Sequence, residues 1–595
     1  MISTTEATTV LSLQSEGNVT EVSLTESADA STRVSRQFFS ALGFDDDPFA
    51  YTNADQEVRL EDYFIPPPYF PSVFGNPEHP RPFVVFAPRG GGKSAQRRMI
   101  ETQCQENHVL AVTYDRFEFP TVRAASEVTL QHHLRSIIRF ALMGLLVTVH
   151  ANPELKEKLT KHDREIMVGI AADHLSGINE VILKQTLNSL RSLSDKVRDF
   201  WNAWLPLINM GINVFLKKLL GVEADLTKYQ DPRSLAASSL KYQLGLVVDL
   251  AQGMDFQSIY VLMDRVDEAE LTGNNALNSF KLAEPLFRDL ELLEFNGMGF
   301  KLFLWDQLEP AYLEIARTDR IRHETLEWHD RMLMEMWQKR LKAYSAGKIS
   351  SLASISERAT PYSVDQLALI FANRSPRDML RIGAQIFTEQ LQIDRFSSRI
   401  APEAVYAGIE KFCARRAAEL VSDRTLDELK RIGQVDFTIP YLANDVFRET
   451  SNGTRNRIYR WRQEGAIDDL ERVENPNPEQ TRPVKLFAVR DVRIAQTMFP
   501  GVPIPRFLEL KYKQCDRCGA TVLRDWGDKD SLSRCSECQY DLASMEEDKL
   551  DDWKRREQAT QTRRRYRKES LEGIQSSFFD DLDWDSEDDK SPELN

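Results

Sequence analysis

A glycine-rich loop between an apolar run and a helical pattern constrains the fold of this 595-residue chain more than any other feature. The loop reads Ala87-Pro-Arg-Gly-Gly-Gly-Lys-Ser94 and follows the apolar run Phe83-Val-Val-Phe86. It fits G-x-x-x-x-G-K-[ST] with Ala87 in the first glycine position, and residues 87–94 are called the phosphate loop below. Glycines allow the backbone to curl so that successive N–H groups point inward at phosphate oxygens.

Each position of the phosphate loop has a predicted role in binding a nucleotide and its metal. Lys93 would place an ammonium group near the β- and γ-phosphates, and the Ser94 hydroxyl would ligate Mg²⁺. A helical pattern over residues 96–103 follows, and the dipole at a helix N-terminus favours an anion. The other predicted nucleotide contacts are Arg89, Gly90, Gly91, Gly92 and Ala95. The alternative is a glycine-rich turn with an exposed lysine.

Four short apolar runs predict a parallel α/β sheet. They cover residues 83–86, 108–114, 258–263 and 299–305, and helical patterns lie between them. The second and third runs are separated by far more chain than a crossover helix needs, so we expect a helical insertion of roughly 100 residues within about 120–250.

A cluster of acids after the third apolar run supports a nucleotide site. Asp264 ends this run, and Asp267 and Glu268 follow. Ligands of open α/β sheets bind beyond the carboxyl ends of the strands. We expect Asp264 to hold Mg²⁺ and Glu268 to activate the attacking water, with Asp267 as the second choice. The alternative is an acidic cluster at a helix N-terminus.

The order of patterns along the chain predicts several domains around an α/β P-loop NTPase core. The predicted parts are a disordered leader at 1–36, the core with its insertion at 37–330, a helical lid at 331–432, a winged helix–turn–helix at 433–500, a zinc ribbon at 508–545 and a charged disordered tail at 546–595. The leader is rich in Ser and Thr and lacks aromatic residues, so it cannot bury enough apolar surface to fold.

The winged-helix prediction depends on the segment that follows the lid. We expect helices at 439–449 and 454–463, a tight turn at 451–453 and strands at 466–473 and 484–489. The second helix carries four arginines suited to phosphates and base edges in a DNA major groove: Arg455, Arg457, Arg460 and Arg462. Winged helices also serve as protein-docking modules, and this alternative stays open.

Two C-x-x-C pairs, 16 residues apart, predict a structural zinc site. The ligands would be Cys515, Cys518, Cys535 and Cys538, which complete a closed tetrahedron of thiolates. So small a module is expected to fold only with its metal. The alternative is a redox role, which two pairs without a thioredoxin-like pattern disfavour.

Charge and hydropathy limit the partners of the chain. The formal net charge of −15 excludes a basic protein that coats nucleic acid, so any such contact requires a local patch. No uninterrupted apolar stretch reaches the roughly 18 residues of a membrane span, and no secretory signal is present, so we expect a cytoplasmic protein. The acidic end of the tail could bind a basic protein partner.

The acidic motif and the order of the parts resemble known families. Residues 261–268 resemble the second motif of NACHT-type NTPases, which belong to the STAND class related to AAA+ proteins. The order of core, lid and winged helix resembles origin-recognition-type initiator ATPases. The chain departs from many AAA+ proteins at Arg265, where they carry the water-activating Glu directly after the metal-binding Asp.

This resemblance implies further site residues. Asp306 or Gln307, at the end of the fourth predicted strand, would sense the γ-phosphate, although a plain turn is the alternative. Arg377, at the start of a helix, would reach the phosphates as the lid arginine does in these ATPases. A finger acting across a subunit interface has three candidates: Arg317, Arg320 and Arg322.

The sequence therefore predicts an ATP-binding and ATP-hydrolysing molecular switch. Its Mg²⁺–ATP state would control homo-oligomerisation or nucleic-acid binding, in bacterial defence, mobile-element control or regulation of DNA transactions. Two other classes remain: a non-enzymatic DNA-binding regulator whose nucleotide site is a relic, and a protein scaffold.

Overall fold

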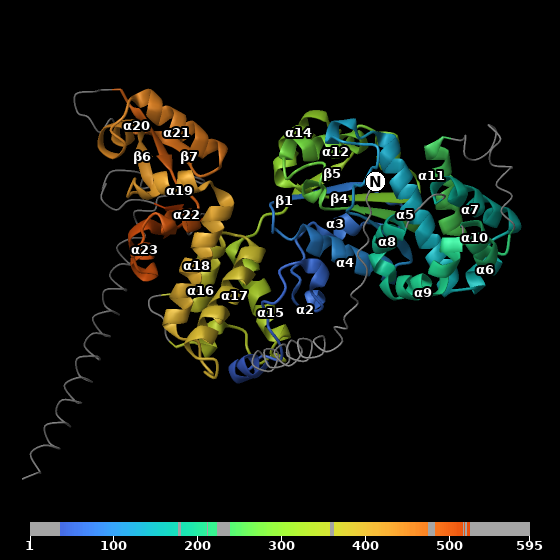
Figure 1. Ribbon diagram of the computed structural model, residues 1–595, viewed down its shortest axis with the longest axis horizontal. Helices are drawn as coiled ribbons and strands as arrows, with labels where there is room; N and C mark the ends of the chain where they lie inside the picture. The colour runs from blue at the N-terminus through green and yellow to red at the C-terminus, as the bar shows by residue number, and fades with distance from the viewer. Residues whose placement is uncertain are drawn as a thin grey trace, which may run out of the picture. The chain divides into compact units, whose positions relative to one another are not determined.

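The structure is a computed structural model that describes residues 36–175, 180–210, 212–222, 239–357, 362–473, 482–515, 517 and 521–523. Within these ranges the chain forms two compact units (Figure 1). Unit 1 comprises the residues up to Glu357 together with Val364–Ile409, and unit 2 comprises Arg358–Ser363 and the residues from Glu410 onward.

Unit 1 is built on a five-stranded parallel sheet. The strands are β1 (Phe83–Ala87), β2 (Val109–Tyr114), β3 (Ser258–Met263), β4 (Met298–Trp305) and β5 (Arg322–Thr325), in the order β2-β3-β4-β1-β5. The structure confirms the parallel α/β sheet and its four predicted strands. The sequence did not predict β5, because this edge strand reads Arg-His-Glu-Thr and is only partly buried.

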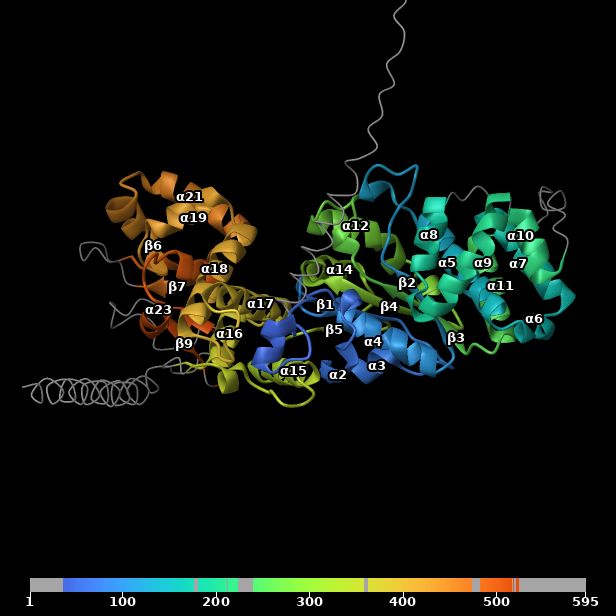
Figure 2. The same cartoon turned by 60° about the horizontal axis from the view of Figure 1, so that its bottom comes forward.

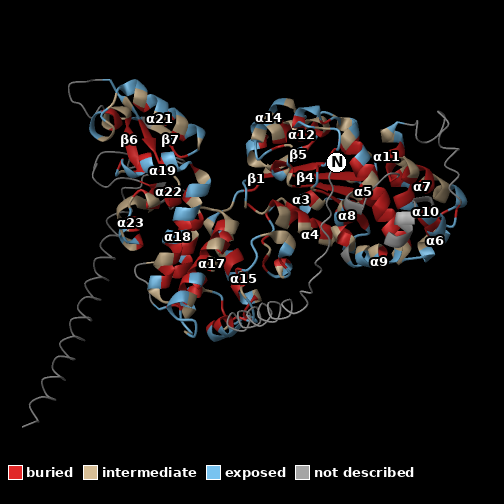
Figure 3. Ribbon diagram, viewed as in Figure 1, coloured by how far each residue is buried: buried red, intermediate tan, exposed pale blue. Residues whose placement is uncertain are grey.

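Alternate side chains of the strands pack against helices on both faces of the sheet. Phe83 and Val85 contact one cluster with residues of α3 (Phe70–Phe74) and α4 (Lys93–Glu106). Val84 and Phe86 belong to the larger cluster on the opposite face. Helices α5 (Leu130–Ala151), α11 (Leu240–Gly253) and α12 (Ala276–Phe287) cover that face. In Figure 3 the central strands β1 and β4 are drawn in the red of buried residues.

The predicted insertion lies between β2 and β3. Between α5 and α11 it contains α6 (Glu154–Lys158), α7 (Lys161–His174), α8 (Glu180–Asn188), the 3₁₀ helix η3 (Arg191–Leu193), α9 (Ser194–Met210) and α10 (Ile212–Leu220). These helices gather beside α5 (Figures 1 and 2). Among the described helices, α5 is long and apolar enough to span a membrane, but 78% of its apolar window is buried in the protein.

Three helices after β5 complete unit 1 and pack against the segment that precedes β1. These lid helices are α15 (Asp330–Ala343), α16 (Val364–Ala372) and α17 (Pro376–Ile393). The approach segment, residues 36–82, contains η1 (Ala54–Gln56) and α2 (Leu60–Tyr63). Phe49 stacks on Trp337 of α15 at 4.8 Å between ring centroids. A Cβ on Gly383 of α17 would lie 2.6 Å from the Phe49 ring, so this packing requires glycine.

Where the sequence predicts a winged helix–turn–helix, unit 2 contains helices beside a three-stranded antiparallel sheet. Its antiparallel sheet has the order β6-β8-β7, from β6 (Asp436–Thr438), β8 (Val484–Ala488) and β7 (Asp468–Val473). Helix α21 (Ser451–Gln463) carries the four arginines. The other described α-helices from the end of unit 1 onward are α18 (Pro402–Leu420), α19 (Asp423–Lys430), α20 (Ile439–Tyr441), α22 (Val492–Thr497) and α23 (Ile504–Lys511).

Two local predictions in unit 2 need correction: a predicted turn is helical, and a predicted helix ends early. The expected turn at 451–453 is the first turn of α21, because the Thr450 side chain accepts a hydrogen bond from the Gly453 N–H at 3.3 Å and caps the helix earlier. The expected helix at 439–449 ends at residue 446: it consists of α20 (Ile439–Tyr441) followed by a π-helical turn, Leu442–Val446. The apolar spacing of this segment does not mark where the helix ends.

The zinc prediction falls mainly outside the described residues. Cys515 is buried beside the short ribbon of β9 (Tyr512–Gln514) and β10 (Thr521–Leu523). Cys518, Cys535 and Cys538 lie outside the described residues, as do the predicted leader up to residue 35 and the charged tail. The zinc ribbon therefore stays a prediction.

Candidate functional site

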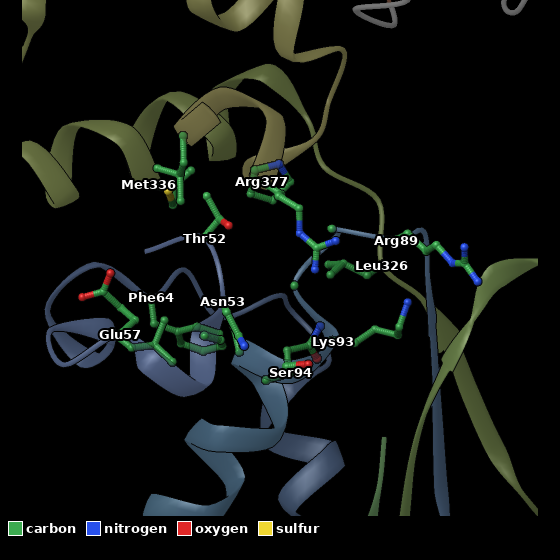
Figure 4. A pocket seen from close by; sticks show the side chains of 18 of the residues that line it. Thr52, Asn53, Glu57, Phe64, Arg89, Lys93, Ser94, Leu326, Met336 and Arg377 are labelled. Atoms are coloured by element: carbon green, nitrogen blue, oxygen red, sulfur yellow. The ribbon is translucent and has the colours of Figure 1, made fainter. Parts of the chain in front are cut away.

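Unit 1 contains a cavity of about 530 Å³ beyond the carboxyl ends of β1 and β3 (Figure 4). The approach segment, the phosphate loop, the residues after β3 and the lid helices all contribute to its wall. The walls combine apolar side chains such as Leu60 and Phe64 with charged groups such as Lys93 and Arg377. A cavity with an apolar part and a few convergent polar groups is typical of a small-molecule site.

Two glycines of the phosphate loop adopt backbone conformations that other residues rarely adopt. Gly90 and Gly92 have φ of 78° and 102°. The curl that they allow brings carbonyl groups within reach of Lys93, whose Nζ donates to the oxygens of Ala87 at 2.9 Å and of Pro88 at 3.3 Å. Trp328, which follows β5, donates its indole N–H to the Gly91 carbonyl at 2.7 Å. The loop is therefore held in its curled form from both sides.

The Lys93 side chain is buried and surrounded by carboxylates. Burial lowers the pKa of its ammonium group, while nearby Asp267, Asp264 and Asp306 oppose the shift. Asp306 starts the 3₁₀ turn directly after β4, and burial raises the pKa of its carboxyl while Lys93 opposes this. Asp306 thus lies close enough to Lys93 to affect the pKa of its ammonium group, but Asp306 is not one of the residues that line the cavity.

Ser94 and Asp264 come together as a metal site requires. The Ser94 Oγ donates to Asp264 Oδ2 at 2.7 Å, and Asp264 Oδ1 accepts from the Arg265 N–H at 2.9 Å. A hydroxyl and a carboxylate are hard oxygen ligands of the kind that Mg²⁺ prefers, usually together with waters and substrate phosphates. The residues present therefore fit a magnesium ion held between the phosphate loop and β3.

The two candidate catalytic acids lie in different environments. The Asp267 side chain is 5% exposed and accepts from Arg89 Nε of the phosphate loop at 2.8 Å. The Arg89 guanidinium also stacks over Trp305, 4.2 Å from the ring centroid. The Glu268 side chain is 56% exposed and lies 3.7 Å from Arg265 Nε. Both acids line the cavity, and each is paired with an arginine.

Arg265, the departure from the family pattern, belongs to a buried charge cluster. Its φ of 58° is left-handed, and its Nη2 lies 2.5 Å from Asp55 Oδ2. Asp55 also pairs with Arg97 and Arg191. Burial would raise the pKa of the Asp55 carboxyl, but the three arginines outweigh this effect and lower it to about 2.

We expect the stability of the protein to depend on Asp55 at low pH. The pKa of Asp55 is lower in the folded state than its ordinary 3.8, so its contribution is present above about pH 4 and is lost as the pH falls toward 2. The difference amounts to about 2 kcal/mol. Urea unfolding midpoints measured from pH 7 to pH 2 should therefore fall less steeply for Asp55→Asn than for the wild type. The exposed Asp62→Asn is the control, and equal slopes for all three proteins would contradict the expectation.

The lid arginine predicted from the resemblance does line the cavity. Arg377 is in the first turn of α17, where Ser375 accepts from the Asp378 N–H at 3.2 Å. Figure 4 shows its side chain extending from the lid toward the loop that carries Lys93 and Ser94. A Cβ on Gly90 would be 3.0 Å from the Arg377 Cβ, so the loop and the lid touch here.

The three finger candidates are paired within the chain. Arg317 binds Asp319, Arg320 binds Glu294, and Arg322 lies 3.1 Å from Glu324. All three side chains are largely exposed, so the structure leaves the choice among them open.

The arginines of α21 divide into two pairs. Arg457 and Arg460 are less than a third exposed and bind Glu428 of α19, and Arg457 also binds Glu449 at 2.9 Å. Arg462 is half-exposed, 3.1 Å from Asp469. Arg455 is exposed and donates to Asn452 at 2.8 Å. The outer face of α21 therefore presents Arg455, Asn456, Tyr459 and Arg462.

Several residues of the site were not predicted from the sequence. Trp328 holds the loop, Arg381 lines the cavity from α17, and Asn53 lines it from the approach segment. No local pattern marks any of them, because each reaches the cavity or the phosphate loop only through the tertiary fold.

Comparisons with known proteins give a distant structural likeness. No protein-family model matches the chain, and no curated protein matches it. A search of solved structures finds one described as "Structure of the Aeropyrum Pernix ORC2 protein (ADPNP-ADP complexes)". It is 10% identical with a TM-score of 0.31, and the match covers 74% of this chain and 97% of that one. At this level of similarity the chemistry of the site must be argued from its own residues.

Proposed function

We propose that this chain binds ATP with Mg²⁺ in the cavity of unit 1, hydrolyses it slowly, and uses the nucleotide state as a switch. One observation carries the proposal: Lys93, Ser94 and Asp264 converge at the carboxyl edge of the sheet beside a curled glycine loop. A cation, a hydroxyl and a carboxylate in this arrangement match the needs of a triphosphate and its metal.

The cavity offers separate regions for the two ends of a nucleotide. Lys93 and Arg377 supply positive charge for the phosphates, and Ser94 with Asp264 would hold the metal. The metal would neutralise charge on the phosphate oxygens. Leu60, Phe64, Ile65, Pro67, Met336 and Leu380 offer apolar surface for a base.

The pairing of both acids with arginines supports slow hydrolysis. A carboxylate must accept a proton from water, or orient it, to assist the attack on the γ-phosphate. Arg89 holds Asp267 at 2.8 Å, and Arg265 lies 3.7 Å from Glu268, so in both cases an arginine competes with the attacking water for the carboxylate oxygens. Such a site suits a switch that keeps ATP bound for long periods.

The test is to measure ATP binding, turnover and particle mass on the full chain. We expect Mg²⁺-dependent binding of ATP, turnover well below once per second, and a change in particle mass between the ADP-bound and ATP-bound states. Glu268→Gln and Asp267→Asn, measured side by side, would show which acid assists hydrolysis. A chain that binds neither ATP nor GTP at millimolar concentration would overturn the proposal.

A second candidate function, the binding of duplex DNA by unit 2, is supported by the outer face of α21. This face carries arginines, an asparagine and an exposed tyrosine, which suit phosphates and base edges. This function is compatible with the switch, in which case ATP would control access to DNA. If the chain bound DNA but not ATP, it would be the non-enzymatic DNA-binding regulator that the sequence analysis gave as an alternative.

Charge reversal on α21 tests this second function. Arg455→Glu combined with Arg462→Glu should weaken duplex binding at least about tenfold and reduce its dependence on salt, because two phosphate contacts are lost. Arg506→Glu combined with Arg415→Glu, which reverses two exposed arginines elsewhere in unit 2, is the control. Equal binding by both variants in electrophoretic mobility shifts would exclude this face. If the wild type bound a protein partner but no DNA, the chain would instead be a protein scaffold.

Three further proposals rest on the sequence alone. Cys515, Cys518, Cys535 and Cys538 hold one structural Zn²⁺. ATP-bound chains form a homo-oligomer, and the acidic tail binds a protein partner.

A further inference from the structure

The helical insertion is attached to the edge of the sheet beside the proposed nucleotide site. In the strand order β2 is an edge strand, and its Thr113 N–H donates to the carbonyl of Ser189 at 2.9 Å. The Ser192 carbonyl accepts from Gln105 of α4, the helix that follows the phosphate loop. Residues 189–193 of the insertion thus cover the free edge of β2 and contact α4.

Arg191, within this attached segment, reaches from the insertion into the charge cluster. Its guanidinium binds two carboxylates: Asp55 of the approach segment and Asp115, which follows β2. Both acids are largely buried, with 15% and 4% of their side chains exposed. Arg191 supplies the ion pair to Asp55 among the described residues of the insertion. It does not line the cavity.

The same cluster continues to the proposed metal ligand. Asp55 binds Arg97 of α4, which is fully buried, and Arg97 Nε lies 3.0 Å from Asp264 Oδ2. That oxygen also accepts the hydrogen bond of Ser94. An unbroken series of ion pairs therefore runs from Arg191 through Asp55 and Arg97 to Asp264. In this order the four residues come from the insertion, the approach segment, α4 and the end of β3.

The position of Arg97 decides how freely Asp264 can bind a metal. A guanidinium and Mg²⁺ compete for the same carboxylate oxygen, so a small displacement of Arg97 changes the affinity of Asp264 for the ion. Ion pairs buried in this way are weakly screened by solvent and salt, which lets the displacement of one member act on the next. Outer groups that orient a metal ligand commonly change metal affinity when they are removed.

We infer that Arg191 is a positioning residue through which the helical insertion sets the Mg²⁺ affinity of the nucleotide site. The inference rests on the proposed function and adds its regulation. Any ligand or partner that shifts residues 189–193 would move Asp55, then Arg97, and so raise or lower the metal affinity at Asp264. The insertion thereby acts as the sensing part of the switch.

The test compares ATP binding with and without metal in variants of Arg191. Arg191→Gln should lower the Mg²⁺ concentration needed for half-maximal binding of a fluorescent ATP analogue about tenfold, because Asp55 without Arg191 attracts Arg97 more strongly and draws it away from Asp264. Binding of the same analogue in EDTA should stay at the wild-type level, because Arg191 does not line the cavity. Arg191→Lys keeps the charge but cannot bind two carboxylates as a planar fork, so it should give an intermediate value. Arg198→Gln, an exposed arginine in the same insertion, is the matched control.

The possible outcomes separate the inference from the proposed function. If the wild type binds no nucleotide, the proposed function fails and the inference with it. If the wild type binds ATP and folded Arg191→Gln shows unchanged Mg²⁺ dependence, or loses binding equally in Mg²⁺ and in EDTA, the role of Arg191 is only structural and the inference is wrong. Should Arg191→Gln not fold, Asp115→Asn removes one anchor of Arg191 and leaves the other. It should strengthen the remaining pair of Arg191 with Asp55 and so shift the Mg²⁺ dependence in the opposite direction.

Discussion

Replacing Lys93 with alanine should weaken ATP binding at least about a hundredfold. Lys93 is 9% exposed and lies in a loop that offers few other cations, so the charge that it would place on the phosphates is poorly replaced by solvent. A hydrogen bond to a charged group contributes about 1.5–3 kcal/mol, and an ammonium group can make two to a triphosphate. Isothermal titration with ATP and Mg²⁺ measures the loss directly.

The control for this experiment is a lysine elsewhere in unit 1. Lys339→Ala removes a partly exposed lysine of α15 that lies 3.0 Å from Glu335 and does not line the cavity, so it should leave ATP binding unchanged. Because Lys93 also holds the carbonyls of Ala87 and Pro88, thermal unfolding of Lys93→Ala must show that the fold persists. Wild-type affinity in a folded Lys93→Ala variant would mean that the cavity does not bind phosphates through this loop.

Replacing Arg340 with methionine should lower the free energy of unfolding of unit 1 by about 3–5 kcal/mol. Arg340 of α15 is fully buried and lies 2.6 Å from Glu57 Oε2, which is also buried. It donates in addition to the carbonyls of Pro48 and of Tyr51, the latter at 3.0 Å. Methionine fills much of the space but leaves the Glu57 carboxylate without its cation. Urea unfolding at pH 7 measures the loss.

The pH dependence of this loss identifies its cause. In the wild type, burial would raise the pKa of Glu57, but Arg340 and the Tyr344 hydroxyl outweigh it and hold the pKa below its ordinary value. In Arg340→Met burial acts without the opposing charge of Arg340, so the pKa of Glu57 rises and Glu57 takes up a proton as the pH falls. The destabilisation should therefore be largest near pH 7 and shrink toward pH 4. Lys339→Met on the exposed side of α15 is the control, and a loss that does not vary with pH would point to packing alone.

Much of the fold could be predicted because its signals are local. The phosphate loop, the four apolar runs and the acids after β3 are each readable within ten residues, and the parallel sheet then brings them to one edge. The insertion was predictable from chain length alone. The edge strand β5 was not, because Arg322–Thr325 has the composition of a loop and becomes a strand only by pairing with β1.

The electrostatic environment of the site could not be predicted from the sequence, because it depends on ion pairs between residues that are far apart in the chain. Asp55 meets Arg265 across more than 200 positions, and Glu428 meets Arg457 and Arg460 from another helix. From the sequence, Arg457 and Arg460 were predicted to be available to DNA. The structure pairs two arginines of α21 within the protein, so the outer face of that helix is narrower than its composition suggests.

The strand order determines where additional helices can be inserted into this fold. The phosphate loop leaves the sheet from β1, an interior strand, whereas the insertion leaves it from β2, three strand positions away at the edge, or about 14 Å at ordinary strand spacing. Helices can be added or exchanged at this edge without disturbing the backbone curl at β1. The fold thus separates the part that must keep one shape from the part that is free to acquire new ones.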